Sequence, residues 1–442
     1  MITNAREVAV EVLGKVLNQG AYSNIALDHA FSSAKLKDED TSLVTEITYG
    51  TLKHLITIDM ILEKNISIPL KKVESNVMNI LRISIYQMKY LDRIPSYAVI
   101  NEAVNLTKQY SKTASGFVNG VLRGYLRKAD QELTFKNELE KDSFTYAFPL
   151  WMVKLFKDQY GKNYRKIMEG LNERPSITYR VNRLKMERGE ALERLESLGY
   201  HAEKTKISPY GIEVKGGRSV LDNQLFKEGA LTVQDESSML VAGLLVEETA
   251  KGYLDLCSAP GGKATGIAEL TGDQVPILAF DIYESKLKQI RENKNRLGIK
   301  SIKPILHDAK ILMPEFKGTS NVLLDAPCSG LGIIRKKPEI KYTKGQKELN
   351  SLVTLQRELL DVAKAYVSED GLLVYSTCTL NKKENEENAR WFLVENKDFE
   401  AYPVELGQEE NLIYTEEGFV TILPGNTMDG FFMARFRKIG KK

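Results

Sequence analysis

The chain has 442 residues, of which 43% are hydrophobic and 27% are charged. Lys and Arg number 62 against 59 Asp and Glu, so the net charge is only +3. These values are typical of a globular protein of two or three domains, and they exclude a low-complexity disordered chain.

The cysteines, histidines and apolar runs limit the class of protein further. The three cysteines, Cys257, Cys328 and Cys378, are too few for a disulfide framework, and no CxxC pair or cluster of the four histidines indicates a metal site. The first residues lack the basic and apolar regions of a signal peptide. No apolar run approaches the roughly 18 residues of a membrane span. We expect a cytoplasmic protein with no membrane segment and no metal.

Residues 1–135 show the apolar spacing of helices. Hydrophobic side chains recur at positions i, i+3, i+4 and i+7 in segments such as AREVAVEVLGKVL and VESNVMNILRISIYQMKYL. Pro95 lies in the short break DRIPS between two such segments, because proline does not fit a helix interior. We predict an all-α bundle over 1–135.

Residues 140–235 have a different pattern. SITYRVNRLK alternates as a strand does, RGEALERLESLGY is an amphipathic helix that ends at Gly199, and GIEVKG and GALTVQD have the composition of strands. This predicts a small α+β module that acts as a linker and contacts RNA.

Over residues 236–442 strands alternate with helices, the pattern of a mostly parallel sheet. The expected strands are YLDLC, PILAFDI, IKPILHD, NVLLDAP and GLLVYSTC. The segment GFVTILPGNTMDGFFMARFRK predicts a closing antiparallel pair. We predict an α/β domain over 236–442.

The stretch YLDLCSAPGGKATGIAEL predicts a strand, a glycine-containing loop and a helix. Such a loop lets a ligand approach backbone N–H groups at a helix N-terminus. The glycines are adjacent, so this is neither the dinucleotide fingerprint nor the phosphate loop, and a tight turn alone also favours glycine. The loop residues that we expect to bind a cofactor are Cys257, Ser258, Ala259, Pro260, Gly261, Gly262 and Lys263.

Three aspartates, Asp281, Asp308 and Asp325, end successive expected strands. In open α/β sheets ligands bind at these ends, and an acidic residue about 20 positions after the loop accepts hydrogen bonds from ribose hydroxyls. A single aspartate there is more often a loop cap. Three of them favour a nucleoside ligand, with Asp281 on the ribose, Asp308 near the base and Asp325 as a further ligand. Because the loop lacks a pyrophosphate fingerprint, S-adenosylmethionine is favoured over NAD.

Cys328 follows the fourth expected strand and Cys378 ends the fifth, so both thiols are expected to face one cleft. A lone cysteine is usually a small buried hydrophobe, but packing does not explain why all the cysteines lie at strand ends of one sheet. Methylation of a pyrimidine at carbon 5 would explain why two cysteines lie at this edge of the sheet. A thiolate that adds at carbon 6 makes carbon 5 nucleophilic toward a sulfonium methyl, and a second polar group assists loss of the carbon-5 proton. This chemistry does not rank the two cysteines.

The motifs LDLCSAPGGK, LLDAPCSGLGIIRKKPEIK and YSTCTLNKKENE resemble those of the RNA cytosine-5 methyltransferases of the NOL1/NOP2/Sun group. The resemblance implies a Rossmann-like methyltransferase domain that uses S-adenosylmethionine. It implies that Cys378, in the Thr-Cys motif, is the nucleophile and that Cys328 assists product release, whereas in related DNA enzymes the Pro-Cys thiol attacks. Asp325, in its protonated form, is expected to hydrogen-bond the pyrimidine ring.

The segments TEITYGTLKHLITIDMILE, LRISIYQMKYLDRIPSYAVINEAV and FVNGVLR resemble the NusB-like RNA-binding domain of bacterial members that methylate 16S rRNA. The resemblance therefore covers nearly the whole chain. It implies cytosine 967 of 16S rRNA as the target, in naked RNA or in an early-assembly small subunit.

Two tracts rich in Lys and Arg, 286–303 and 334–347, suit a polyanion bound on one face, and a solvated helix or loop is the alternative. We predict that Arg335, Lys336 and Lys337 bind RNA phosphates. Two other functions stay open: the same chemistry on another rRNA or a tRNA cytosine, and a non-catalytic RNA-binding factor of the antitermination type.

Overall fold

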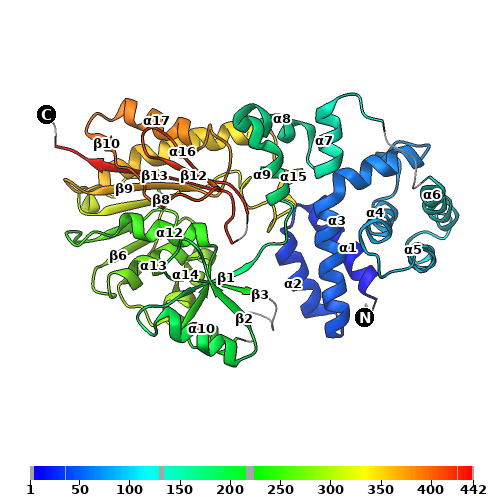
Figure 1. Ribbon diagram of the computed structural model, residues 1–442, viewed down its shortest axis with the longest axis horizontal. Helices are drawn as coiled ribbons and strands as arrows, with labels where there is room; N and C mark the ends of the chain where they lie inside the picture. The colour runs from blue at the N-terminus through cyan, green and yellow to red at the C-terminus, as the bar shows by residue number, and fades with distance from the viewer. Residues whose placement is uncertain (1–3, 35, 129–133, 216–222, 426, 441–442) are drawn as a thin grey trace. The chain divides into compact units, whose positions relative to one another are not determined.

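A computed structural model describes residues 4–34, 36–128, 134–215, 223–425 and 427–440. The chain forms two compact units (Figure 1). Unit 1 consists of Met1–Asn172 and Ile334–Lys344, and unit 2 consists of Glu173–Ile333 and Gly345–Lys442.

The described part of unit 1 is helical, which confirms the predicted bundle. Its helices are α1 (Ala5–Gln19), α2 (Ser23–Ser33), α3 (Asp38–Asn65), α4 (Ser75–Tyr90), α5 (Ser96–Tyr110), α6 (Ser115–Arg127), α7 (Glu138–Tyr146), α8 (Leu150–Tyr160), α9 (Tyr164–Gly170) and α15 (Ile340–Thr343), with the 3-10 turns η1 (Leu70–Lys72) and η2 (Gly161–Asn163). Apolar residues at helical spacing, such as Val8, Val12 and Val16 in α1, are buried, and α1 to α6 share one core. Gly50 lets α3 approach α4, because a Cβ atom there would lie 2.0 Å from the Tyr86 ring.

Unit 2 contains a small antiparallel sheet in the order β2-β3-β1-β4 among its described residues. Its elements are β1 (Ile177–Val181), α10 (Arg188–Ser197), β2 (His201–Lys204), β3 (Gly211–Lys215), α11 (Gln224–Lys227) and β4 (Leu231–Val233). The strands and the amphipathic helix predicted over 176–235 are therefore confirmed.

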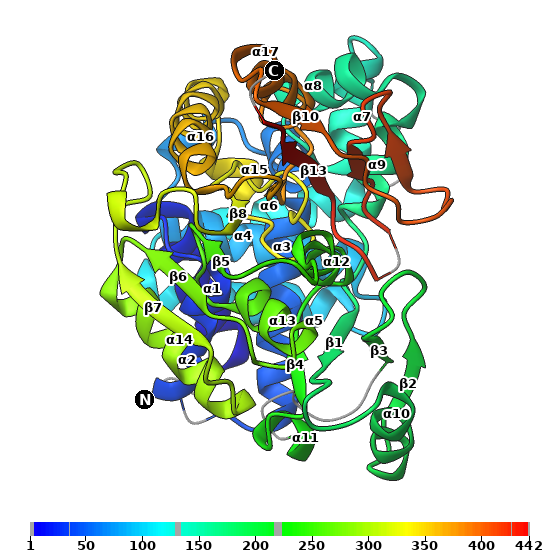
Figure 2. The same ribbon diagram turned by 90° about the vertical axis from the view of Figure 1, so that its left-hand side faces the viewer.

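The larger sheet of unit 2 has the order β11-β12-β13-β9-β8-β5-β6-β7, with β10 paired to β13, over the described residues. Its strands are β5 (Tyr253–Asp255), β6 (Ile277–Asp281), β7 (Ile302–Leu306), β8 (Asn321–Asp325), β9 (Leu372–Thr377), β10 (Phe399–Ala401), β11 (Leu412–Tyr414), β12 (Val420–Ile422) and β13 (Phe431–Lys438). Strands β5 to β9 run parallel, and Figure 2 shows β5 to β8 of this set. Strands β12 and β13 form the predicted antiparallel pair (Figure 1). Strands β10 and β11 are too short to have been predicted from their alternation.

Helices cover both faces of this sheet. They are α12 (Glu236–Leu245), α13 (Gly262–Leu270), α14 (Glu284–Leu297), α16 (Gln346–Tyr366) and α17 (Glu386–Glu395), with η4 (Pro314–Phe316) as a short turn. In β8, Leu323 packs in the core beneath α12 to α14, whereas Val322 and Leu324 pack beneath α16 and α17. Because side chains alternate between the faces of a strand, burial on both faces produces the continuous apolar run VLL. The Rossmann-like α/β fold is confirmed.

The compact units divide the chain differently from the predicted domain boundaries. Helices α7 to α9 belong to unit 1, although they fall within the predicted 140–235 module. Residues 334–344, which follow the Pro-Cys motif, also belong to unit 1. The boundaries at 135, 140 and 235 remain predictions. Of the helices that the structure describes, none is long and apolar enough to cross a membrane.

Candidate active site

The candidate residues of unit 2 lie at the carboxyl ends of its parallel strands. Strand β5 lies between β6 and β8. Helix α13 connects β5 to β6 on one side, and β8, which comes later in the chain, lies on the other side of β5. Ligands bind in open α/β sheets where the strand order reverses in this way. The loops that follow β5 and β8 both begin at this point.

The loop between β5 and α13 is held by backbone hydrogen bonds, one to β6 and one within the loop. The Ser258 N–H donates to the Phe280 carbonyl over 2.9 Å, and the Gly261 N–H donates to the Ser258 carbonyl over 2.6 Å. Gly261 has a φ of +96°, in the left-handed region that favours glycine, and α13 begins at Gly262. The adjacent glycines therefore turn the chain directly into a helix, whose first N–H groups lack intrahelical partners.

Arg180 of β1 fixes the start of α13. Its guanidinium donates to the two carboxylate oxygens of Glu269, at 2.9 and 2.8 Å. It also donates to the Gly262 carbonyl at 2.5 Å and to the Thr265 hydroxyl at 2.9 Å. Both side chains of the ion pair are 3% exposed, and burial raises the pKa of Glu269 against the opposing effect of Arg180. Sequence reasoning missed Arg180, because nothing in SITYRVNRLK marks its partner.

Asp255, the last residue of β5, is a buried acid that sequence reasoning also missed. It is 1% exposed, and neither carboxylate oxygen has a hydrogen bond within the described part of the chain. Burial raises the pKa of Asp255 to about 7, although the Ser258 hydroxyl and the Cys257 backbone lie close enough to oppose this shift. A buried acid without hydrogen bonds is unfavourable unless a ligand satisfies it. The signal in the sequence that could have identified Asp255 is its position at the end of an expected strand, two residues before Cys257.

Asp281 ends β6, as predicted, and is 6% exposed. Its carboxylate accepts the Tyr283 N–H at 3.2 Å and lies 3.7 Å from Nζ of Lys286. Both contacts come from the first turn of α14, so the carboxylate is held at the sheet edge.

Asp308 lies two residues beyond the end of β7, because that strand ends at Leu306. Its carboxylate accepts the Lys310 N–H at 3.0 Å. Beside these aspartates three large apolar side chains are more than half exposed: Ile282 at 51%, Tyr283 at 55% and Leu306 at 55%.

Lys263 and Asp325 form an ion pair near the cysteines. Lys263 Nζ lies 2.6 Å from Asp325 Oδ2, and the Ser376 hydroxyl donates to Asp325 Oδ1 at 2.7 Å. Burial opposes the charged form of Lys263, but the hydrogen bond and charge of Asp325, with a smaller effect of Asp255, raise the pKa of Lys263. Lys263 was predicted from the loop alone, and its pairing with Asp325 was not.

The structure brings Cys328 and Cys378 together. Their Sγ atoms are 3.2 Å apart. The Gly332 N–H donates to the Cys378 carbonyl at 3.0 Å, so the two loops also meet through their backbones. The contact with Cys378, with burial, raises the pKa of the Cys328 thiol well above its ordinary value, and burial likewise raises the pKa of Cys257.

Comparison with known families matches the three parts of the chain. Residues 242–437 match the family described as 16S rRNA methyltransferase RsmB/F. Residues 3–127 match the NusB family, and residues 148–221 match the ferredoxin-like domain of RsmF/B-like methyltransferases.

Relatives match over the full length of the chain. The probable ribosomal RNA small subunit methyltransferase B of Bacillus subtilis is 36% identical and covers 99% of this chain and 99% of its own. The ribosomal RNA small subunit methyltransferase B of Cronobacter sakazakii is 30% identical over 98% of this chain and 99% of its own. The chain belongs to the RsmB/F family of 16S rRNA methyltransferases.

Solved structures agree with membership of the RsmB/F family. The crystal structure of PH0851 has a TM-score of 0.82 and 27% identity, over 99% of this chain and 100% of that chain. A methyltransferase homolog protein from Pyrococcus horikoshii has a TM-score of 0.61 and 25% identity, over 69% of this chain and 100% of its own. The predicted family and NusB-like domain are confirmed, and so is the prediction of an rRNA methyltransferase.

The residues predicted to bind RNA begin the segment 334–344 of this RsmB/F family member. Arg335 is 7% exposed, and Lys336 and Lys337 are half-buried. Lys337 Nζ lies 5.2 Å from the centre of the Tyr22 ring. The burial of Arg335 leaves little of its guanidinium for a phosphate, so RNA contact by these three residues remains a prediction.

Lys341, in the same basic tract, was not singled out by the sequence and is 1% exposed. Its ammonium donates to the carbonyls of Lys53 and Ala147 at 3.0 Å each and to Asn172 Oδ1 at 2.9 Å. Burial, with the charge of Lys53, lowers the pKa of Lys341 well below its ordinary value. Part of the tract is therefore packed inside unit 1 and is not a free basic surface.

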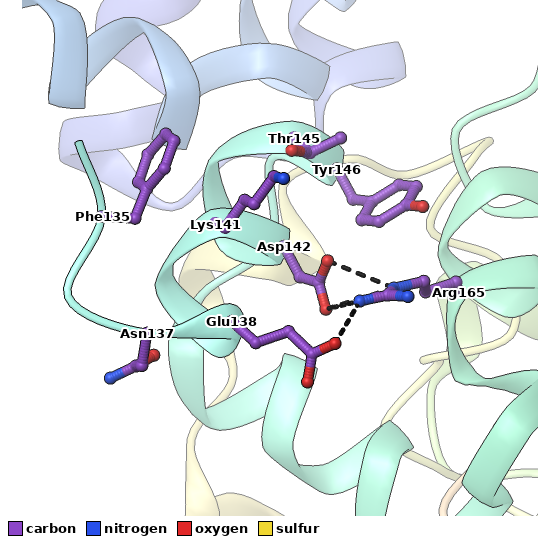
Figure 3. A pocket seen from close by; sticks show the side chains of 8 residues that line it. All are labelled: Phe135, Asn137, Glu138, Lys141, Asp142, Thr145, Tyr146 and Arg165. Carbon is purple, nitrogen blue, oxygen red and sulfur yellow. Dashed lines mark hydrogen bonds and ion pairs between the residues drawn. The ribbon is translucent and has the colours of Figure 1, made fainter. Parts of the chain in front are cut away.

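Unit 1 also contains a pocket of about 470 Å³ beside α7 and α9 (Figure 3). It is lined by Phe135, Asn137, Glu138, Lys141, Asp142, Thr145, Tyr146 and Arg165. Figure 3 shows Arg165 turned toward Glu138 and Asp142, with nitrogen–oxygen distances of 2.7 and 3.2 Å. Because these charges pair within the wall, the pocket does not by itself indicate a ligand. Within the described ranges no group of three or more His, Cys, Asp or Glu is arranged to hold a metal ion.

Proposed function

We propose that this chain transfers a methyl group from S-adenosylmethionine to carbon 5 of cytosine 967 in 16S rRNA, through an adduct between Cys378 and carbon 6. The observation that carries this proposal is the 3.2 Å between the Cys328 and Cys378 sulfurs at the strand ends that also hold the Lys263–Asp325 pair. Family membership supports the rRNA substrate.

The residues after β5 and β6 fit the cofactor. The buried Asp255 carboxylate, which has no hydrogen bond within the described residues, would be satisfied by the ammonium of the methionine part. Asp281 would accept the ribose hydroxyls, and Asp308, with the exposed Ile282 and Tyr283, would flank the adenine. When bound, S-adenosylmethionine supplies an electrophilic methyl group.

Lys263 and Asp325 are suited to the polar edge of cytosine. The target base must leave its stack to enter the cleft. Asp325 would accept the exocyclic amino group, and Lys263 would donate to the ring carbonyl or nitrogen 3. Its positive charge would favour electron flow into the ring as the thiolate adds at carbon 6. In this proposal the hydrogen-bond donor to the ring is Lys263 rather than a protonated Asp325, because the raised pKa of Lys263 favours its charged form.

The two thiols have different surroundings. Contact with Cys378, together with burial, raises the pKa of the Cys328 thiol, which supports giving the attack on carbon 6 to the other thiol. Cys378 lies close enough to the Lys263 ammonium for their charges to interact, a setting typical of reactive cysteines. Cys378 would add to carbon 6. Cys328, in its thiolate form, would take the carbon-5 proton, and cleavage of the carbon–sulfur bond would then release the Cys378 thiolate.

The direct test is methylation of a 16S rRNA transcript by the full chain with labelled S-adenosylmethionine. We expect 5-methylcytosine at position 967, located by bisulfite sequencing, and no label on a transcript with uracil there or on tRNA. A label at another base atom would contradict the carbon-5 chemistry. 5-Methylcytosine at a different position, or on tRNA, would contradict only the target.

A further inference from the structure

Glu384 lies in the loop between β9 and α17 and is completely buried, with 0% exposure. Four donors converge on its carboxylate. One oxygen accepts the Ser329 N–H and Gln356 Nε2, both at 2.9 Å. The other accepts the Ser329 hydroxyl at 2.6 Å and Asn381 Nδ2 at 3.1 Å. A carboxylate side chain has enough lone-pair sites to accept all four.

These contacts reach the residues on both sides of Cys328. Ser329, which follows it, is bonded to Glu384 through both its backbone N–H and its hydroxyl. Gln356 Nε2, which donates to Glu384, also donates to the carbonyl of Pro327, the residue before Cys328, at 2.9 Å. The backbone that carries Cys328 is thus held by Glu384 directly and through Gln356.

The residues on either side of Cys378 are held by Asn385, which follows Glu384 in the chain. The Thr377 hydroxyl donates to Asn385 Oδ1 at 2.6 Å, and Asn385 Nδ2 donates to the Thr379 carbonyl at 2.9 Å. The Thr379 hydroxyl lies 2.7 Å from the Ser329 hydroxyl and so connects the two cysteine loops. We define the Glu384 network as Ser329, Gln356, Thr379, Asn381, Glu384 and Asn385.

We infer that Glu384 is a positioning residue that holds the Cys328 and Cys378 thiols within contact distance for the reaction. The inference rests on the roles proposed above for the two thiols. Glu384 does not touch the reacting base. It acts through the backbones of two loops, which chain connectivity alone does not hold together because they follow different strands. Buried polar networks of this kind rigidify a site only when every member is satisfied.

The distance between the thiols can be measured without RNA or S-adenosylmethionine. Diamide takes two electrons and two protons from a pair of thiols and becomes a hydrazine while the sulfurs form a disulfide. The rate of this reaction between Cys328 and Cys378, followed by peptide mapping, reports how often the sulfurs meet. Peptide mapping also separates this bond from any bond to Cys257.

The main variant is Glu384→Gln, with Glu386→Gln as its matched control. The amide replaces one acceptor oxygen by a donor, so at least two of the four hydrogen bonds can no longer form. Glu386 is also buried, at 6% exposure, but one carboxylate oxygen accepts the Thr421 hydroxyl and the other has no hydrogen bond within the described residues. We expect Glu384→Gln to slow disulfide formation and to lower kcat about tenfold or more, given the strength of hydrogen bonds to a charged acceptor. S-Adenosylmethionine affinity should stay the same, and Glu386→Gln should change none of these quantities.

Thr379→Val is the second variant, in case Glu384→Gln does not fold. It keeps the shape of the side chain and removes the hydroxyl, which contacts the Ser329 hydroxyl and accepts the Asn381 N–H at 3.3 Å. A slower disulfide reaction and a lower kcat, both smaller in extent than for Glu384→Gln, would support the inference. Unchanged disulfide rates in the folded variants would overturn it, whatever happens to methylation. Slower disulfide formation with normal methylation would instead contradict the proposed roles of the thiols.

Discussion

The two cysteines are chemically alike, but each alanine variant should leave a different product. Cys378→Ala is expected to abolish methyl transfer and to form no RNA adduct, because the attacking sulfur is gone. Cys328→Ala should still add to the base and accept the methyl group, but release should stall and leave protein bound to RNA. Denaturing gels of each variant with RNA and S-adenosylmethionine distinguish the two.

The double variant, Cys328→Ala with Cys378→Ala, is the control and should form no adduct. A stable adduct with Cys378→Ala and none with Cys328→Ala would reverse the assignment. The attacking thiol would then be in the Pro-Cys motif, as in the related DNA enzymes.

Asp255 predicts a pH dependence of folding stability. Burial raises its pKa from 3.8 to about 7, so the folded chain holds this proton more tightly than the unfolded chain. The free energy of unfolding that this tighter proton binding contributes is fully present below about pH 4 and is lost as pH rises through about 7. A shift of this size corresponds to on the order of 4 kcal/mol.

Urea denaturation at pH 5 and pH 8, without S-adenosylmethionine, measures this contribution. The wild-type chain should lose more stability over that interval than Asp255→Asn, whose amide does not titrate. Equal losses in the two proteins would show that Asp255 is not the group responsible.

The proposed contact of Asp281 with the ribose predicts that substitution of this residue weakens S-adenosylmethionine binding. Asp281→Ala should lose two charge-assisted hydrogen bonds to the ribose, each worth roughly 1.5–3 kcal/mol before compensation, so the affinity should fall at least about tenfold. Calorimetry with S-adenosylmethionine measures it. Asp361→Ala, which removes an exposed acid paired with Lys364 on α16, should bind normally. Unchanged affinity in Asp281→Ala would refute the ribose assignment.

Between elements, the connection that matters most for the cofactor loop is the ion pair from β1 to α13. Arg180→Met should destabilise the chain by about 3–5 kcal/mol, because it leaves the Glu269 charge buried without its partner. It should also weaken S-adenosylmethionine binding, since the hydrogen bond to the Gly262 carbonyl is removed. Urea denaturation and calorimetry measure the two effects.

The control is Arg180→Met combined with Glu269→Met, which removes both charges. The double variant should recover most of the stability, because an apolar pair can replace a buried ion pair at little cost. It should not recover the cofactor affinity, since the bond to the loop is still missing. If affinity returned with stability, the ion pair would affect the loop only through folding.

At the scale of the whole molecule, RNA binding should depend on the exposed part of the first basic tract. Lys288, Lys300 and Lys303 are exposed, whereas part of the second tract is buried in unit 1. Reversing these three charges to Glu should weaken RNA binding and lower the salt slope by roughly 0.7–0.9 for each phosphate that the variant no longer neutralises. Filter binding over a salt series measures both.

Reversal of Lys154, Lys157 and Lys162, which belong to unit 1, provides a control of equal charge. If both sets of reversals weakened binding equally, the effect would be one of net charge. If reversal in the first tract left the affinity and slope unchanged, that tract would not be an RNA surface.

Much of the fold could be predicted from the sequence, because helical and strand periodicities are local. The bundle over 1–135 and the strands that end at Asp281 and Asp325 follow from side-chain spacing alone. The glycine loop and the two cysteine motifs could likewise be located, because a motif is a short run of chain. Family resemblance then implied an RNA methyltransferase, and the comparisons confirm an rRNA methyltransferase.

Only the tertiary structure decided which of these residues meet. The contact between Cys328 and Cys378, the pairing of Lys263 with Asp325 and the hold of Arg180 on α13 all join residues at least fifty positions apart. Tertiary packing also decided that Arg335 and Lys341 are buried, although the sequence shows them only as part of a basic tract. The physical reason is that the burial and hydrogen bonds of a residue depend on side chains from other helices and strands. The spacing of residues along one element does not identify those partners.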